Sequence, residues 1–387
     1  MNLNKINWLF VLLLSLIIVG CNTDRKEREK NNQDNRTFLY SENLQYAKGF
    51  SIEYYEEFTK VILNNPWSKN HEPYAEYHLY KSNTKNSATS KIGINSFNTP
   101  LTSLVVNTFS YFEFLSLLNE LETINGVTDG IRIYNPKILN KLKNNEILDL
   151  GDPFKPNIEK TIELNPDAVV NSAYAQVDSY SDRVLKSGIP VIYSLEWMET
   201  TPLARAEWIK MIAAFDEKGD LADSLFNEIE RKYLSAKEVV SGIDNYKSVL
   251  AGDNFQDTWY LPGGESFNAT LFRDAGLNYF FKDKSQRGSI GLDIESILTQ
   301  FGHTDIWFGC VSDSYKQLAN KDSKYMLLTP VKNKQVFNNH KRITPSGGND
   351  YFESAIANPD LILSDIVKAA YPELMPNYNF SYIKPLK

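Results

Sequence analysis

The side chains in this sequence best suited to bind a small molecule are aromatic residues that follow short apolar runs. Parallel strands bring their carboxyl ends to one edge of a sheet, where concave binding sites form. Five aromatic residues follow such runs, and a sixth lies in a Gly-Gly-Asn-Asp-Tyr loop: Tyr111, Tyr174, Trp197, Trp259, Tyr260 and Tyr351. Their rings would bury large area against a flat, partly apolar ligand. The alternative for each of them is ordinary core packing.

The sequence lacks the patterns that covalent catalysis or a protein-held metal ion would require. No Ser, His and Asp follow the order seen around a nucleophile elbow, and no Cys–His pair is present. The four histidines, at 71, 78, 303 and 340, are scattered, and surface or edge positions are favoured over a meeting of His71 and His78. The Gly pairs at 263–264 and 347–348 lack phosphate-loop spacing and are interpreted as turns. We therefore expect no enzyme activity, no resident metal and no cofactor.

Charge excludes one class of partner. The net charge is −7 and no basic block is present, so nucleic acid is not an expected partner. Arg132, Arg183 and Arg287 could pair with an anionic ligand, although solvated surface charge is favoured for each. The content of 42% hydrophobic and 23% charged residues is typical of globular proteins.

The element that must position these residues is a pair of helices predicted over 200–241. Thr and Pro start the first helix, residues 216–220 interrupt the apolar pattern, and a second amphipathic run follows. On both sides, short apolar strands alternate with helices, which indicates parallel sheets covered by helices. We predict an α/β protein with an N-terminal lobe (38–199), a helical spine (200–241) and a C-terminal lobe (242–387). A single α/β domain with a helical crossover is the alternative.

The remaining elements follow from local patterns. Alternating segments within 38–82 predict an antiparallel hairpin or meander at the edge of the first lobe. Buried strands are predicted at 104–106, 168–171, 189–193, 248–251 and 305–308, and helices at 110–122, 177–186, 267–275, 294–301 and 358–370. A weak internal repeat links the two lobes: Glu159 and Asp167 in the first resemble Glu295 and Asp305 in the second.

The first residues form a processing segment. Lys5 precedes an apolar run, Trp8 to Val19, which is too short for a comfortable membrane span. The run ends in Ile-Val-Gly-Cys21, which resembles the bacterial lipobox. We predict a signal peptide (1–20) and a lipidated Cys21 at the start of a disordered tether (21–37). A short retained anchor is the alternative. The protein would then be lipid-anchored in the cell envelope, facing the periplasm or on the cell surface.

Several segments together resemble the class III periplasmic substrate-binding proteins of ABC importers. The resemblance runs from about residue 90 to about residue 375. The matching stretches are 157–170, 188–191 (Gly-Ile-Pro-Val), 202–208, 347–351 and 358–365. It implies two α/β lobes bridged by a rigid spine, with the ligand in the cleft between them. It also implies that the ligand is an iron–siderophore, haem or vitamin B12.

The resemblance also assigns roles and partners. A ferric siderophore is the first expectation for the ligand, with a corrinoid or haem as alternatives, and a chelatase-like enzyme as a less favoured one. Glu159 and Glu295 fall on positions that dock to the permease in this family. Without the resemblance, both acids are explained by their place in the first turn of a helix. The implied partners are an ABC permease with its ATPase, a metal chelate and, through the lipid, a membrane. The chain is expected to be a monomer.

Overall fold

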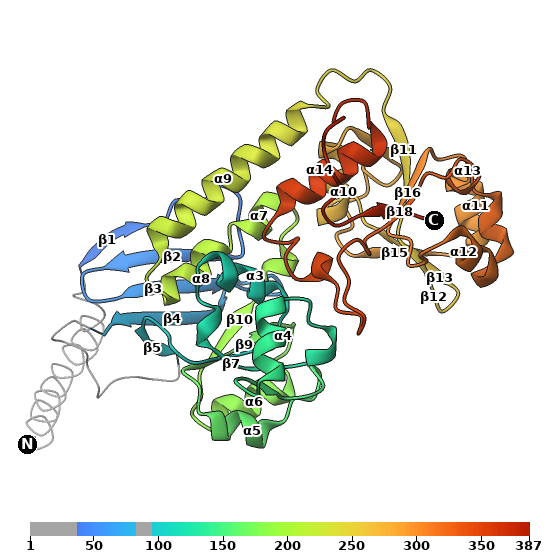
Figure 1. The fold of residues 1–387 in the computed structure, drawn as a ribbon. Coiled ribbons are helices and arrows are strands. Elements are labelled where there is room, and N and C mark those ends of the chain that lie inside the picture. Colours follow the sequence, from blue (N-terminus) through green and yellow to red (C-terminus); the bar gives the residue numbers. More distant parts are fainter. Residues whose placement is uncertain (1–36, 83–94) are drawn as a thin grey trace, which may run out of the picture.

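The computed structural model describes residues 37–82 and 95–387 of the chain. Its first layer is a five-stranded sheet in the order β1-β2-β3-β4-β5, antiparallel except for the parallel β4–β5 pair (Figure 1). This N-terminal sheet agrees with the predicted antiparallel meander. Its strands are β1 (Phe38–Ser41), β2 (Phe50–Tyr55), β3 (Thr59–Asn64), β4 (Pro73–Lys81) and β5 (Ser96–Thr99).

The N-terminal lobe continues with a parallel sheet in the order β10-β9-β6-β7-β8. The central strands are short and buried on both faces, as expected for strands covered by helices. The strands are β6 (Leu104–Val106), β7 (Ile124–Val127), β8 (Leu148–Asp149), β9 (Ala168–Ser172) and β10 (Val191–Ser194). The helices are α3 (Ser110–Leu117), α4 (Pro136–Lys143), α5 (Ile158–Leu164) and α6 (Ser179–Lys186).

The C-terminal lobe holds a second parallel sheet, in the order β14-β11-β16-β17-β18, closed by the antiparallel β18. A small antiparallel sheet, β12-β13-β15, packs beside it. The strands are β11 (Lys247–Ala251), β12 (Asp253–Phe255), β13 (Thr258–Pro262), β14 (Leu277–Tyr279), β15 (Ser289–Leu292), β16 (Ile306–Phe308), β17 (Val336–Asn338) and β18 (Lys384–Pro385). The helices are α10 (Phe267–Asp274), α11 (Ile294–Phe301), α12 (Tyr315–Lys321), α13 (Thr329–Lys332) and α14 (Pro359–Ala370).

Helices α7 (Pro202–Ala206), α8 (Ile209–Phe215) and α9 (Gly219–Glu238) connect the two lobes (Figure 1). Helix α7 begins as predicted, with Pro202 at its first position and the Thr201 hydroxyl accepting the Ala204 N–H. The long α9 runs beside the N-terminal sheet and packs against α14 of the C-terminal lobe. The α/β class and the parallel sheets flanked by helices are therefore confirmed, with the break near residue 216 where it was expected.

Two buried carboxylates fasten the N-terminal sheet to this connection. Glu207 is fully buried, and its oxygens accept the backbone N–H groups of residues 45–47 at 2.7–2.9 Å. Glu199 accepts those of Lys48 and Gly49 at 2.8 and 2.7 Å, and the indole N–H of Trp208 at 3.2 Å. A buried charge is stable only when it is paired or hydrogen-bonded. The chain before β2 therefore has a fixed position on the spine.

The weak internal repeat has a structural basis. Asp167, before β9, accepts the N–H of Thr102 and Ser103 at 2.8 and 3.0 Å, next to β6. Asp305, before β16, accepts the N–H and hydroxyl of Ser248 at 2.7 Å, in β11. In each lobe the aspartate joins the starts of two neighbouring parallel strands.

The local predictions differ from the structure mainly at element ends. The helix predicted over 110–122 stops at Leu117, and Asn119, with φ of 59°, starts a turn that leads into a short 3-10 segment. Such a left-handed conformation cannot continue a helix. Within the two described ranges, no helix combines the length and apolar character needed to cross a membrane.

Candidate functional site

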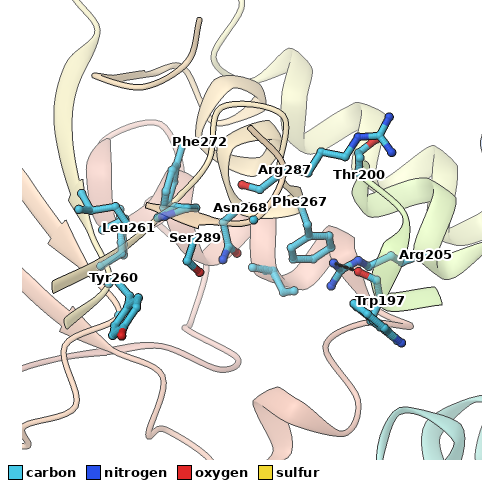
Figure 2. A pocket seen from close by; sticks show the side chains of 18 of the residues that line it. Trp197, Thr200, Arg205, Tyr260, Leu261, Phe267, Asn268, Phe272, Arg287 and Ser289 are labelled. Carbon is cyan, nitrogen blue, oxygen red and sulfur yellow. Dashed lines mark hydrogen bonds between the residues drawn. The ribbon is translucent and has the colours of Figure 1, made fainter. Parts of the chain in front are cut away.

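A cavity of about 630 Å³ lies where the last residues of the N-terminal lobe and the start of the spine face the C-terminal lobe. Residues 197–200 and Arg205 form one wall, and the opposite wall comes from the C-terminal lobe. Figure 2 shows Tyr260 at one end of the cavity and Trp197, Arg205 and Phe267 grouped at the other. The volume falls in the range of small-molecule sites, about 300–1,000 Å³.

Two glycines at the carboxyl ends of parallel strands open the floor of the cavity. Gly252 follows β11 and Gly309 follows β16, with φ of 79° and 86°. A side chain on Gly252 would begin 1.9 Å from the Tyr260 carbonyl oxygen. Only glycine fits there, because both the space and the left-handed conformation exclude a Cβ atom.

The prediction that Trp259 faces the ligand is wrong. Its side chain is fully buried, 5.0 Å from the Trp307 ring and 5.7 Å from Tyr325. Its indole N–H donates to the Ala251 carbonyl at 2.9 Å, and that of Trp307 donates to the Gly252 carbonyl at 2.8 Å. The two indoles therefore support the cavity floor from behind.

Tyr111 also lies in the core. Only 3% of this residue is exposed, on the face of α3 that packs into the lobe, and it does not line the cavity. The structure thus corrects this prediction as well. Tyr260, Trp197 and Tyr351 do line the cavity, whereas Tyr174 lies just beyond it, with its ring 6.3 Å from that of Trp197.

Arg205 is a charged group that hydrogen bonds and a ring contact hold in the cavity wall. Its guanidinium lies 4.2 Å from the centre of the Phe267 ring, and it donates to the Trp197 and Glu199 carbonyls at 2.8 and 3.2 Å. Burial lowers the pKa of this guanidinium, although an arginine stays charged at any physiological pH. Of the other arginines considered, Arg287 lines the cavity 3.8 Å from Glu265, while Arg132 and Arg183 pair with nearby acids elsewhere.

Several wall residues were missed by the sequence analysis. Phe267 and Phe272 belong to α10, which begins at the cavity with Ser266 as its N-cap. The sequence predicted a helix over 267–275 but gave these two residues no role, because nothing local distinguishes a core face from a cavity wall. The four histidines do not line the cavity, and His340 instead contacts Asp313 at 3.2 Å. Across the described part of the chain, no cluster of three or more His, Cys, Asp or Glu could hold a metal ion.

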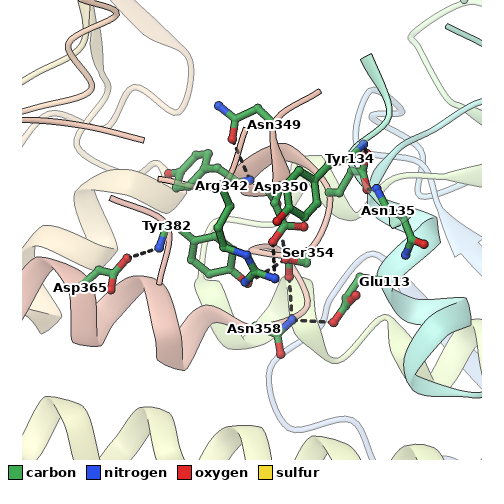
Figure 3. A network of polar contacts seen from close by, with 12 residues as sticks. Glu113, Tyr134, Asn135, Arg342, Asn349, Asp350, Ser354, Asn358, Asp365 and Tyr382 are labelled. Carbon is green, nitrogen blue, oxygen red and sulfur yellow. Dashed lines mark hydrogen bonds and ion pairs between the residues drawn. The ribbon is translucent and has the colours of Figure 1, made fainter. Parts of the chain in front are cut away.

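Next to the cavity, a polar network joins the two lobes (Figure 3). Glu353 accepts the backbone N–H groups of Tyr134 and Asn135, the latter at 2.9 Å. Asn358 donates to Glu113 of α3 at 3.0 Å. Arg342 lies between the Tyr134 and Tyr382 rings, 5.6 and 5.4 Å from their centres, and pairs with Asp350 at 2.9 Å. The C-terminal segment 342–358 therefore holds the N-terminal lobe through both backbone and side-chain contacts.

This network holds three carboxylates, Glu113, Asp350 and Glu353, and Arg342 pairs with only one of them, Asp350. Burial raises the pKa of Glu353 to about 7; Asp350 and Glu113 add to the rise, and the two backbone N–H groups oppose it. Burial also raises the pKa of Asp350 and of Glu113. The proton on Glu353 is therefore held in the folded state at pH values where an exposed glutamate has lost it.

Glu159 and Glu295 occupy matching positions in the two lobes. Each lies in the first turn of a short helix, α5 or α11, and each side chain is mostly exposed. Glu159 lies 3.3 Å from Arg183, and Glu295 lies 2.7 Å from Lys324, which lowers its pKa. Neither residue lines the cavity. Their role in docking stays a prediction.

Comparison with known proteins identifies the family. Residues 110–342, more than half of the chain, match the family described as periplasmic binding protein. The chain belongs to this periplasmic binding protein family. An uncharacterized lipoprotein of Methanocaldococcus jannaschii is 26% identical to it over 94% of this chain and 91% of its own length. A second uncharacterized lipoprotein of that organism is 22% identical, covering 96% of both chains.

Solved structures agree on the fold. The periplasmic heme-binding protein RhuT from Roseiflexus sp. RS-1 has a TM-score of 0.56 at 14% identity, covering 71% of this chain and 99% of its own. A possible iron-binding periplasmic solute-binding protein from Staphylococcus epidermidis has a TM-score of 0.54 at 19% identity, covering 70% and 99%. Helicobacter pylori CeuE with Ni(II) bound has a TM-score of 0.55 at 18% identity, covering 73% and 88%.

These findings confirm the resemblance and settle the class of activity. The family consists of solute-binding proteins, so this periplasmic binding protein is not an enzyme. The predicted lipidation site at Cys21, the signal peptide and most of the tether lie outside the described residues. The names of the curated relatives agree with a lipoprotein.

We predict that Glu353 makes the stability of this periplasmic binding protein depend on pH. A raised pKa means that the folded state binds more protons than the unfolded state. The contribution of Glu353 to the free energy of unfolding should therefore be largest below pH 4.5 and should be lost as the pH rises through about 7. The rise from 4.5 corresponds to about 3 kcal/mol. Urea unfolding at pH 5 and pH 8 should show a smaller difference for Glu353→Gln than for the parent protein.

Glu163→Gln, at an exposed position of α5, is the matched control and should keep the parent pH dependence. If the Glu353→Gln and parent proteins lose the same stability between the two pH values, then Glu353 does not hold a proton in the folded state.

Proposed function

We propose that this protein captures a metal chelate, a ferric siderophore, in the cavity beside the spine and delivers it to an ABC importer. The observation that carries the proposal is the composition of the cavity wall. Aromatic and aliphatic side chains, with Arg205 and Arg287 among them, suit the outer surface of an organic anion that carries its own metal ligands. The possible iron-binding protein and the heme-binding protein among the structural neighbours support the same class of ligand.

Haem and corrinoid chelates are the alternatives. The wall provides two phenol groups, Tyr260 and Tyr351, and a tyrosine oxygen is one of the axial ligands that haem iron accepts. A purely siderophore-binding site would not need either phenol as a ligand.

The proposal includes a lipid anchor on Cys21. The lipoprotein names of the two relatives from Methanocaldococcus jannaschii support it, together with the sequence Ile-Val-Gly-Cys at 18–21. The anchored chain would work as a monomer at the membrane that carries the permease and its ATPase.

We expect ligand binding to quench tryptophan fluorescence through Trp197. This side chain is 38% exposed and lines the cavity, whereas Trp259 is fully buried behind it. Titration of the mature protein with ferric siderophores, haem and cobalamin should show quenching with at least one chelate. Trp197→Phe should remove most of that signal, and Trp259→Phe should leave the affinity within a few-fold. An absence of binding across the panel, or quenching that survives Trp197→Phe, would contradict the assignment.

We further propose that Glu159 and Glu295 dock to the permease, one from each lobe. Changing both to Lys should leave chelate affinity within a few-fold, because neither residue lines the cavity. It should reduce uptake in reconstituted vesicles strongly, since the loss of one partner from a buried interfacial charge pair costs roughly 2–5 kcal/mol. The control is Glu163→Lys, which makes the charge change of one of these two substitutions at another exposed position of α5. Normal uptake by the double variant would leave both residues with a helix-dipole role only.

A further inference from the structure

A group of four aromatic side chains from separate parts of the chain borders the cavity. We call the group of Trp67, Tyr74, Tyr174 and Trp197 the aromatic shelf. The Trp197 ring lies 6.3 Å from both the Trp67 and the Tyr174 rings, and Trp67 lies 5.8 Å from Tyr74. Trp197 also lines the cavity, so the shelf and the cavity share a wall.

Two members of the shelf come from the N-terminal sheet, which precedes the family match at 110–342. Trp67 lies in the loop between β3 and β4, and its N–H donates to the Asn65 side chain at 3.0 Å. Tyr74, in β4, donates from its hydroxyl to the Tyr174 carbonyl at 3.0 Å. The hairpin of β3 and β4 thus reaches from the N-terminal sheet to the segment that follows β9.

The shelf is rigidly supported. The Tyr74 ring meets Tyr193 edge to face at 5.1 Å, and the Tyr77 hydroxyl accepts the Tyr193 N–H at 3.0 Å. Arg205 fixes the other side through its bond to the Trp197 carbonyl at 2.8 Å. Ordered aromatic groups cost little entropy when a ligand packs against them.

Two of the rings remain open to solvent despite this support. Tyr174 is 47% exposed and Trp197 is 38% exposed, while Trp67 and Tyr74 are partly buried. Single exposed aromatics are common, but a supported cluster that borders a cavity indicates a binding surface. The positive charge of Arg205 lies at the junction between shelf and cavity. A flat ring that carries or adjoins negative charge would match both features.

We propose that the aromatic shelf is a second subsite, which binds an aromatic ring of the chelating ligand while the metal centre occupies the cavity. The N-terminal sheet then determines specificity, because it supplies Trp67 and Tyr74 and holds Tyr174 in place. This inference rests on the proposed function. The subsite favours chelates built from catecholate rings over chelates of the same metal without aromatic groups.

The test compares two ferric chelates on the full mature protein: a synthetic hexadentate tris-catecholate, and desferrioxamine B, a trihydroxamate without aromatic groups. Tyr174→Leu removes an exposed ring and should weaken the tris-catecholate roughly threefold to tenfold, with the trihydroxamate within about twofold. Trp67→Leu should act in the same direction. Tyr174→Phe keeps the ring and should keep the affinity. Tyr246→Leu makes the same change at an exposed tyrosine outside shelf and cavity, and should change neither affinity.

Each other outcome is decisive. If Tyr174→Leu and Trp67→Leu leave the tris-catecholate affinity unchanged, or weaken both chelates equally, the shelf is not an aromatic subsite, while binding by the parent protein still supports the proposed function. If the parent protein binds neither chelate, both the shelf and the ferric-chelate function are overturned.

Discussion

The structure depends on the burial of two carboxylates, Glu199 and Glu207, at the start of the spine. Each would be costly to bury alone, and together they accept five backbone N–H groups from residues 45–49. The N-terminal sheet, the spine and the cavity wall therefore meet in one segment. Trp197, Glu199 and Arg205 lie within nine residues. The same short segment therefore holds the N-terminal sheet, through Glu199, and forms the cavity wall, through Trp197 and Arg205.

In this arrangement, the residues that support the cavity are different from those that would contact a ligand. Buried groups such as Trp259, Trp307 and the glycines after β11 and β16 form a floor that hydrogen bonds to backbone carbonyls hold in place. Half-exposed rings, including Tyr260 and Trp197, supply the surface that a ligand would touch. A preformed cavity of this kind pays little of the ordering cost of binding. The polar network around Glu353 joins the lobes beside the cavity, so lobe movement and cavity shape are physically linked.

The sequence predicted the elements better than the site. Buried strands such as β6 and β9 and capped helices such as α7 and α11 follow from local patterns, and the structure has them within a few residues. The direction in which an individual side chain points does not follow from the local sequence in the same way. Trp259 and Tyr260 are neighbours in β13, and successive strand residues point to opposite faces, so only one of them could face the ligand. The choice depends on which face the small sheet turns to the cavity. Trp67 was missed because a hairpin loop carries no local sign of what it will contact.

We propose that a metal chelate binds in the cavity between Tyr260 and Arg205. The most direct measurement is X-ray diffraction at the iron absorption edge from crystals grown with a ferric chelate that the protein binds in solution. We expect a single strong anomalous peak inside the cavity, with ligand density in contact with Trp197 and Phe267. Iron found only on the outer surface, or a cavity that holds water alone while the chelate is bound elsewhere, would contradict it.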